Sequence, residues 1–190
     1  MGKAKLTEQD FARAAAALSC SVAAIKAVTK VEAPKGGFLP DGQVTILPER
    51  HWFHRLTHGR WTATHPDISN PEAGGYGAEG QHQHDRLQRM TKLDRVNGLM
   101  ATSWGKFQIM GFNHAAAGFP VLQAFITAMH HSEAAQLDAF VNFIKSDGVL
   151  WRALRLKDWT TFARLYNGKG YAKHNYHGRM ADAFKLFGGT

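Results

Sequence analysis

Apolar residues recur at three- and four-residue spacing through most of this chain, and this helical period is the feature that most constrains its fold. The first stripe, Phe11–Leu18, follows Thr7 and Asp10, which have the spacing of a capping box. A second stripe lies within Ser21–Ala33 and must end there, because Pro34 and the two glycines after it cannot continue a helix. These patterns predict two short consecutive helices.

Further stripes of the same period fill the second half of the chain, and a glycine pair at 188–189 ends the last one. No internal repeat is visible, and 190 residues is the length of one domain. These later helices are expected to begin near Leu87, Val121, Leu137, Leu150, Trp159 and Tyr176.

Two regions break the helical pattern. In residues 38–47, a Pro-Asp-Gly-Gln turn separates two apolar runs, which predicts a β-hairpin, and Pro48 then opens a short helix through His54. From Thr57 to Gln83 the chain is rich in Gly, Pro, Asn and Asp, and so long a loop in a compact domain is usually functional. The sequence therefore predicts a mainly α fold (formally α+β) of about eight helices with one small β-hairpin.

The composition limits the partners and the compartment. The formal net charge of +8 attracts anionic polymers, but no nucleic-acid motif is recognisable, so we expect no nucleic-acid partner. No run of 18 apolar residues occurs, and Glu8, Asp10 and Arg13 interrupt any apolar N-terminal segment, so we expect neither a membrane span nor a signal peptide. The single cysteine, Cys20, excludes an internal disulfide and fits synthesis in a reducing cytoplasm.

Two glutamates flank the predicted hairpin. Glu32 ends an otherwise apolar helix, and a carboxyl held against an apolar wall loses hydration, which raises its pKa. A general acid needs a raised pKa near neutral pH, so Glu32 is a candidate proton donor; the alternative is a solvated glutamate at a helix end. Glu49 follows the hairpin, and its alternative role is an ion pair with Arg50.

Two later segments carry polar residues among glycines. In Ala101–Asn113, two glycines permit tight turns or close approach of a ligand, and Gln108 offers both a donor and an acceptor to a sugar hydroxyl or N-acetyl group. The alternative is an irregular helix junction. In Phe162–Tyr171, Tyr166 and Asn167 precede a glycine that ends a helix, so both side chains are expected to project from the helix end.

In this order, the segments "VE…GGF…G…ILPERHWF", "ATSWGKFQIMGFN" and "FARLYNG.GY" resemble the N-acetylmuramidase family of endolysins from phages of Gram-negative hosts. This family is related to goose-type lysozymes and soluble lytic transglycosylases. The resemblance covers roughly Leu6 to Phe187; each motif is weak alone, but three in order are specific. It implies a lysozyme-like fold with two lobes around a sugar-binding cleft, and residues 1–190 as a single catalytic domain without a separate cell-wall-binding domain.

The resemblance also implies roles for individual residues. Glu32 matches the catalytic glutamate that protonates the glycosidic oxygen, and Glu49 matches an acid across the cleft, with Asp41 as the reserve candidate. Glycosidases need two carboxyl groups on opposite sides of the scissile bond, and the goose-type enzymes suggest inversion by analogy. Candidate substrate-binding residues, from matched subsites or from aromatic rings beside the motifs, are Ser103, Trp104, Gln108, Tyr166, Asn167 and Trp52.

The expected activity is hydrolysis of the β-1,4 bond between N-acetylmuramic acid and N-acetylglucosamine in peptidoglycan, by a monomeric lysozyme-type glycosidase that needs no metal or other cofactor. One alternative is a lytic transglycosylase that releases 1,6-anhydromuropeptides, but Lys106 and Phe107 replace the Leu and Met of the transglycosylase motif. Another is a basic envelope-binding protein without enzymatic activity.

The histidines and the cysteine suggest other chemistry. His82 and His84 lie in what reads as a polar loop, and His130 and His131 are adjacent, but neither pair has the ligand spacing of a zinc site. Cys20 has no recognisable histidine partner that would make it a nucleophile. We therefore expect no metal ligands and no cysteine catalysis.

The C-terminal run from Tyr176 combines an apolar stripe with Lys173, Arg179 and Lys185. It reads either as a last helix docked on the core or as a cationic amphipathic segment that contacts lipopolysaccharide phosphates or acidic lipid. The resemblance implies synthesis in the host cytoplasm, host lysis, and action on peptidoglycan in the periplasm.

Overall fold

The computed structural model of the chain describes residues 3–168 and 171–190, so Lys169 and Gly170 of the last motif lie outside the described residues. The described part is mainly helical with one small sheet, which confirms the predicted fold class. Its elements are α1 (Glu8–Leu18), α2 (Val22–Glu32), β1 (Ile46–Pro48), α3 (Arg50–Leu56), α4 (Gln81–Leu93), α5 (Arg95–Met100), β2 (Thr102–Trp104), β3 (Ile109–Met110), the 3-10 helix η1 (Gly111–Asn113), α6 (Leu122–His131), α7 (Glu133–Ser146), α8 (Gly148–Leu156), α9 (Trp159–Asn167) and α10 (Tyr176–Leu186).

The first two helices begin where their capping residues predict. Thr7 and Asp10 form the expected capping box at the start of α1, and the Ser21 side chain accepts a hydrogen bond from the Ala24 N–H at the start of α2. Among the described residues, no individual helix has the length and apolar content needed to cross a bilayer; α1 and α2 meet those criteria only as a pair, with a 108° bend between them.

The predicted β-hairpin is only partly correct. Its turn forms, and a single antiparallel bridge joins Phe38 to Val44. The strand that follows, β1, instead pairs antiparallel with β2, which pairs in turn with β3. The backbone of β1 is thus paired with a segment more than 50 residues away and not with the first arm of the predicted hairpin.

Three local predictions differ from the structure in detail. The short helix predicted from Pro48 through His54 is present as α3, but it begins at Arg50 after the Glu49 N-cap, because Pro48 ends β1. The stripe from Leu87 to Met100 is two helices, because Asp94 is extended and its side chain caps α5. His82 and His84 lie in the first turn of α4 rather than in a loop.

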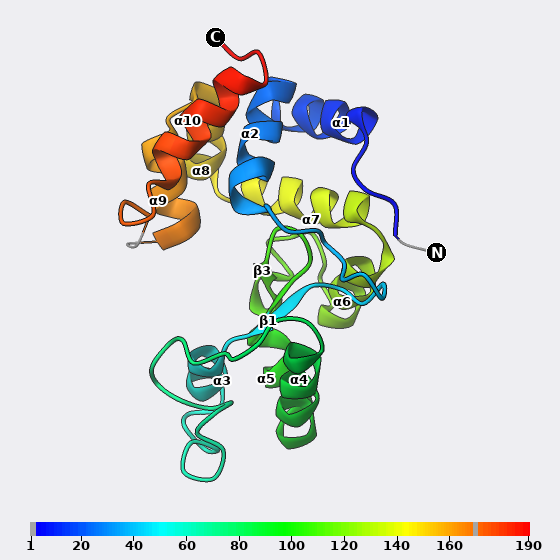
Figure 1. The fold of residues 1–190 in the computed structure, drawn as a ribbon, viewed down its shortest axis with the longest axis vertical. Helices are drawn as coiled ribbons and strands as arrows, with labels where there is room; N and C mark the ends of the chain where they lie inside the picture. Colours follow the sequence, from blue (N-terminus) through cyan, green and yellow to red (C-terminus); the bar gives the residue numbers. More distant parts are fainter. Residues whose placement is uncertain (1–2, 169–170) are drawn as a thin grey trace.

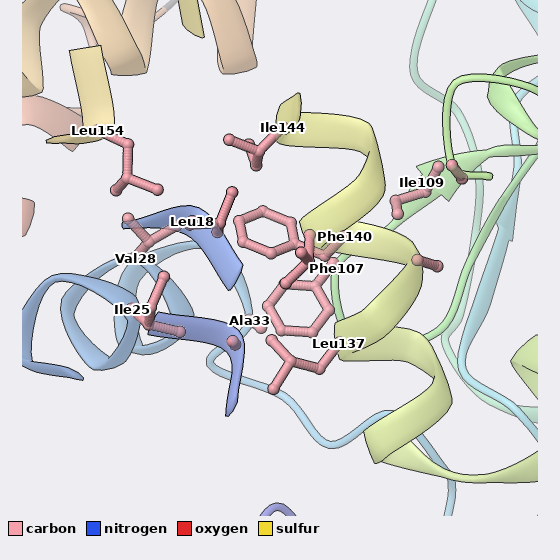
Figure 2. Close-up of a cluster of buried hydrophobic side chains, with 14 of the residues drawn as sticks. Leu18, Ile25, Val28, Ala33, Phe107, Ile109, Leu137, Phe140, Ile144 and Leu154 are labelled. Atoms are coloured by element: carbon pink, nitrogen blue, oxygen red, sulfur yellow. The ribbon is translucent and has the colours of Figure 1, made fainter. Parts of the chain in front are cut away.

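The helices gather in two lobes (Figure 1). The larger lobe contains α1, α2 and α7 to α10, the smaller contains α3 to α5, and the sheet and α6 lie between them. Figure 2 shows the core of the larger lobe, where Leu18, Ile25 and Val28 lie near Phe140 and Leu154. In this core α2 packs against α10, the last helix of the chain. The end of α2 is therefore held by apolar burial, and that end carries Glu32.

Candidate active site

Glu32 is the last residue of α2 and borders a cavity of about 480 Å³. Burial raises the pKa of Glu32 to about 7 from an ordinary value of 4.5, while a hydrogen bond from Asn167 and the positive charge of Arg179 act in the opposite direction. The Asn167 Nδ2 atom donates to Glu32 Oε1 at 2.8 Å. The carboxyl is thus oriented by one amide and holds its proton up to neutral pH.

The cavity lies where the two lobes meet. One wall is the chain that leaves α2, and the other wall comes from the loop before α4 and from the turn between β2 and β3. Its lining consists of residues 32–36, 38–40 and 45–47, then Tyr76, Gly77, Glu79, Gly80 and Gln83, and finally Gly105, Lys106 and Gln108. Glu32 therefore borders a cavity with both apolar and charged walls.

Glu49, the second expected acid, is held in the smaller lobe. Burial raises the pKa of Glu49 to about 7, and a hydrogen bond from Tyr76 opposes that rise. The Glu49 carboxylate lies 3.6 Å from His51 Nδ1, so its neighbour is His51, whereas Arg50 donates to the Glu72 carbonyl oxygen at 2.9 Å. Tyr76 lines the cavity and Glu49 does not, so Glu49 lies behind the cavity wall in this structure.

Asp41, the reserve candidate, lies on the exposed turn before β1. Hydrogen bonds from the backbone and side chain of Gln43 lower the pKa of Asp41. The turn residue beside it, Pro40, lines the cavity, but Asp41 does not. Its carboxylate is engaged within the turn.

Gln108 lines the cavity, and three other predicted substrate-binding residues, Ser103, Tyr166 and Asn167, lie behind its lining. The buried Ser103 hydroxyl donates to Gln108 Oε1 at 2.8 Å. Gln108 adopts φ +48°, a left-handed conformation, and its amide donates to the Gly105 carbonyl oxygen at 2.7 Å. The Tyr166 hydroxyl donates to the Phe107 carbonyl oxygen at 3.0 Å, and burial together with the charge of Glu32 raises the pKa of Tyr166.

The two predicted tryptophans lie away from the cavity lining. Trp104 is only 2% exposed, and its indole N–H donates to the Leu99 carbonyl oxygen, so it is a core residue. Trp52 packs on Phe112 with ring centroids 4.7 Å apart, and Arg55 lies over its ring. Stacking of either ring on a sugar bound in this cavity would require the wall to rearrange.

Two residues that the sequence analysis missed brace the cavity from behind. Glu133 and Gln136, at the start of α7, are buried. The Glu133 carboxylate accepts from the Gly37 N–H at 2.7 Å, and the Gln136 side-chain carbonyl accepts from the Lys106 N–H at 2.7 Å. One turn of α7 therefore fixes both walls of the cavity relative to each other.

This bracing depends on glycine at two positions. A Cβ added at Gly37 would lie 2.1 Å from Gln136 Oε1, and one added at Gly105 would lie 2.6 Å from Gln136 Cδ. Gly105 also has φ +69°, which favours glycine. In the sequence, Gly105 was expected to permit a tight turn or close approach of a ligand, and the structure shows that the group close to it is the side chain of Gln136.

The loop before α4 supplies another part of the cavity that could not be assigned from sequence. Glu79 in this loop forms an ion pair with Lys35, which follows α2, and both side chains are exposed. Gln83 and the buried Arg86 hold the loop from α4, since Gln83 donates to the Tyr76 carbonyl oxygen at 2.8 Å and Arg86 contacts Gln83 at 2.7 Å. The irregular stretch thus forms a wall of the site.

The described residues offer little for other chemistry. Within residues 3–168 and 171–190, no group of three or more His, Cys, Asp or Glu side chains is arranged to hold a metal ion. Burial raises the pKa of Cys20 to about 11, so its thiol stays protonated at neutral pH. His84 contacts the Val44 carbonyl oxygen at 3.0 Å and helps to join α4 to the chain before β1.

Comparison with known proteins identifies the family. A model of the N-acetylmuramidase family matches residues 21–188. The crystal structure of a Burkholderia AP3 phage endolysin is similar to this chain, with 44% sequence identity and a TM-score of 0.90, over 96% of this chain and 70% of that one. None of the curated proteins matches the chain significantly. The family match and this structural likeness confirm the resemblance found in the sequence: the chain belongs to the N-acetylmuramidase family and is a glycoside hydrolase that cleaves peptidoglycan.

Proposed function

We propose that the chain hydrolyses the β-1,4 bond between N-acetylmuramic acid and N-acetylglucosamine, with Glu32 as the general acid. The observation that carries this proposal is a carboxyl with a pKa of about 7 at the edge of a cavity between two lobes. At neutral pH a large fraction of Glu32 is protonated, so it can donate to the glycosidic oxygen as the bond breaks. The 190 residues would act as one catalytic domain.

Asn167 and Arg179 have roles after proton transfer. Departure of the proton leaves a carboxylate in an apolar setting, which is unfavourable without compensation. The Asn167 amide already donates to this carboxyl at 2.8 Å, and the Arg179 charge favours its ionised form. Both residues therefore keep the pKa of Glu32 near neutrality instead of higher, which allows the acid to lose its proton and regain it in each cycle.

Glu49 is the proposed second carboxyl, acting on a water molecule or on positive charge at the anomeric carbon. It belongs to the lobe opposite Glu32, as a pair of glycosidase acids requires. Its pKa of about 7 means that it becomes fully ionised only above neutrality, and Tyr76 lies on the cavity side of it. For Glu49 to act in this role, Tyr76 must either move aside or relay a proton through its hydroxyl. This hydroxyl lies 3.3 Å from His51 Nδ1.

The test compares Glu32→Gln, Glu49→Gln and Asp41→Asn on purified peptidoglycan, with turbidity as the readout. Removal of a general acid is expected to lower the rate by about 10²–10⁴-fold in Glu32→Gln, since proton transfer contributes this much. Glu49→Gln should reduce the rate less, and Asp41→Asn should keep the wild-type rate. Full activity of Glu32→Gln would refute the assignment.

Mass spectrometry of the products distinguishes hydrolysis from the transglycosylase alternative. We expect muropeptides with free reducing ends; 1,6-anhydro products would instead show a lytic transglycosylase. Measurement of the anomer formed first would decide between inversion and retention.

We further propose that the chain is a monomeric phage lysis enzyme, made in the host cytoplasm and acting on periplasmic peptidoglycan. The likeness to a protein described as a phage endolysin supports this role. Phage mutants that lack the enzyme should replicate normally but fail to clear a host culture. Normal clearing by such mutants would contradict the proposal.

The C-terminal helix is a second proposed contact, with lipopolysaccharide phosphates or acidic lipid. Leu186 and Phe187 are 66% and 38% exposed beside Lys185, which is a mixed apolar and cationic surface. Arg179 acts on Glu32, so the test uses Lys173→Ala with Lys185→Ala instead. This double variant should keep its activity on purified peptidoglycan and lose activity on intact cells; equal loss on both would overturn the contact.

A further inference from the structure

A second cavity, of about 420 Å³, opens beside the first one on another face of α2. Ala33 and Pro34 line both cavities, so the two share a wall where the chain leaves Glu32. A group of a bound ligand that extends past Pro34 from the first cavity would therefore meet the second one. A linear glycan would occupy the first cavity alone, whereas a glycan with branches would place its main chain there and a branch in the second cavity.

The second cavity combines positive charge with apolar walls. Lys26 and Lys30 come from the same face of α2, and Phe11 and Phe187 contribute apolar surface. Glu8 lines it too, but both of its oxygens lie 2.7 Å from Lys26 Nζ, so its charge is compensated. The Lys26 ammonium also lies over the rings of Phe11 and Phe187, at 5.6 and 5.7 Å from their centroids.

Lys30 carries the uncompensated charge of this cavity. Its side chain is exposed, and no ion pair involving Lys30 is present in the part of the chain that the structure describes. The lining thus contains two cations and one anion, which leaves one net positive charge available to a ligand. A carboxylate attached to a short, partly apolar chain fits this lining.

We propose that the second cavity binds the acidic peptide stem of peptidoglycan while the glycan lies beside Glu32. The stem is a short peptide with free carboxylates that branches from N-acetylmuramic acid, the sugar whose bond is proposed to be cleaved. Its carboxylates would contact Lys30, and its small side chains would lie against Phe11 and Phe187. This inference rests on the proposed function, since it names a further part of the same substrate.

The experiment compares two forms of one substrate: intact peptidoglycan, and the same material after an amidase has removed the stems. The variants are Lys30→Ala and Lys30→Glu, with Lys92→Ala and Lys92→Glu as matched controls. Lys92 is an exposed lysine on α4 that lines neither cavity, so its variants change the net charge equally.

On intact peptidoglycan, Lys30→Ala should raise KM about two- to fivefold, as loss of an exposed charge contact predicts. Lys30→Glu should raise KM roughly tenfold, because repulsion is added to the lost attraction. Neither substitution should change KM on stem-free glycan, and the Lys92 variants should change it on neither substrate. Equal effects on the two substrates, or equal effects of the Lys30 and Lys92 variants, would overturn the proposal.

Competition with free stem peptide gives a second readout that does not depend on stem-free glycan being a good substrate. The peptide should inhibit the wild-type enzyme on intact peptidoglycan and should inhibit Lys30→Glu much less. Equal inhibition of both would also overturn the proposal. Failure of the proposed function would look different, because Glu32→Gln would then retain activity whatever happens at Lys30.

Discussion

The two lobes are stabilised by different kinds of interaction. In the larger lobe, α1, α2 and α7 to α10 bury one extensive apolar cluster, in which Phe140 stacks on Phe107 at 4.4 Å between ring centroids. Among the described residues, the smaller lobe has a separate cluster of four buried apolar residues, Phe53, Ile68, Met90 and Ala101. Apolar burial therefore holds Glu32, whereas the facing wall has little apolar burial of its own.

Polar contacts replace apolar burial in the smaller lobe. Arg86 is 3% exposed and donates to the Pro48 carbonyl oxygen at 2.8 Å, and Thr57 donates to the Phe53 carbonyl oxygen at 2.7 Å. Such bonds fix geometry but each contributes only about 1 kcal/mol net. The acid is therefore mounted on the lobe with the large apolar core, whereas the part of the facing wall before α4 is held mainly by polar contacts.

The largest effect is expected in the apolar core. Phe140→Ala should lower the free energy of unfolding by about 3–5 kcal/mol, because a fully buried ring is replaced by a cavity. Chemical denaturation measures this change, and Leu156→Ala, at a position 64% exposed, is the control with little effect. A loss under 1 kcal/mol would mean that this core does not stabilise the larger lobe.

A smaller effect is expected when the polar wall is broken. Arg86→Met removes the donors to Pro48 and Gln83, which should cost about 2–3 kcal/mol because buried acceptors lose their partner. Hydrogen exchange should accelerate in α3 and α4 while α2 stays protected, and KM should rise more than kcat falls. Arg89→Met, which removes a half-exposed partner of Asp67, is the control. Uniform loss of protection would contradict independent lobes.

The pH dependence of the free energy of unfolding tests one buried acid in each lobe. The folded-state pKa of Glu32 and of Glu49 is about 7, above the ordinary 4.5, so the folded protein retains protons that the unfolded chain releases between these values. The stability that the folded protein gains from these retained protons is fully present below about pH 4.5 and is lost as the pH rises through 7. Glu32→Gln and Glu49→Gln should each therefore be about 1–2 kcal/mol more stable than wild type at pH 8, after allowance for residual hydration.

Thermal unfolding between pH 4 and pH 8.5 measures this prediction, with Asp41→Asn as a control without that gain. The wild-type rate on peptidoglycan should also decline above pH 7, because the acid loses its proton. A stability difference that is the same at pH 4 and pH 8 would show that neither carboxyl has a raised pKa.

The smallest effect is expected at the ion pair that joins the two sides of the cavity. Lys35 and Glu79 have side chains that are 65% and 77% exposed, so Lys35→Ala should change the free energy of unfolding by less than about 1 kcal/mol. Any difference should vanish in high salt, because exposed charges are screened. A loss above 2 kcal/mol would mean that this pair, rather than Arg86, holds the smaller lobe in place.

The sequence predicted the local parts of this fold well, because local signals determine them. Thr7 and Ser21 mark the starts of α1 and α2 through their side-chain caps, and Pro34 marks the end of α2 because it cannot continue a helix. The partner of β1 was not predictable in the same way, since Ile46 pairs with Trp104 and nothing near Ile46 specifies that partner. Strand pairing depends on which distant segment of the chain is brought beside the strand, and local sequence patterns do not specify that segment.

The same distinction applies to the site. The apolar surroundings of Glu32 in the sequence indicated a raised pKa, which the structure reproduces. The brace formed by Glu133 and Gln136 could not be found, because each contacts backbone groups about 30 to 100 residues away. Trp104 was assigned to the cleft because it lies beside a motif, but its ring points into the core.

The packing of α2 on α10 has a consequence for the timing of activity during synthesis. Glu32 leaves the ribosome early, but its hydrogen-bond partner Asn167 lies 135 residues later and Arg179 later still. A nascent chain that stops before α10 lacks both the charge of Arg179 and the helix against which α2 packs. The surroundings of the acid are therefore complete only once the last helix has been made and packed on α2.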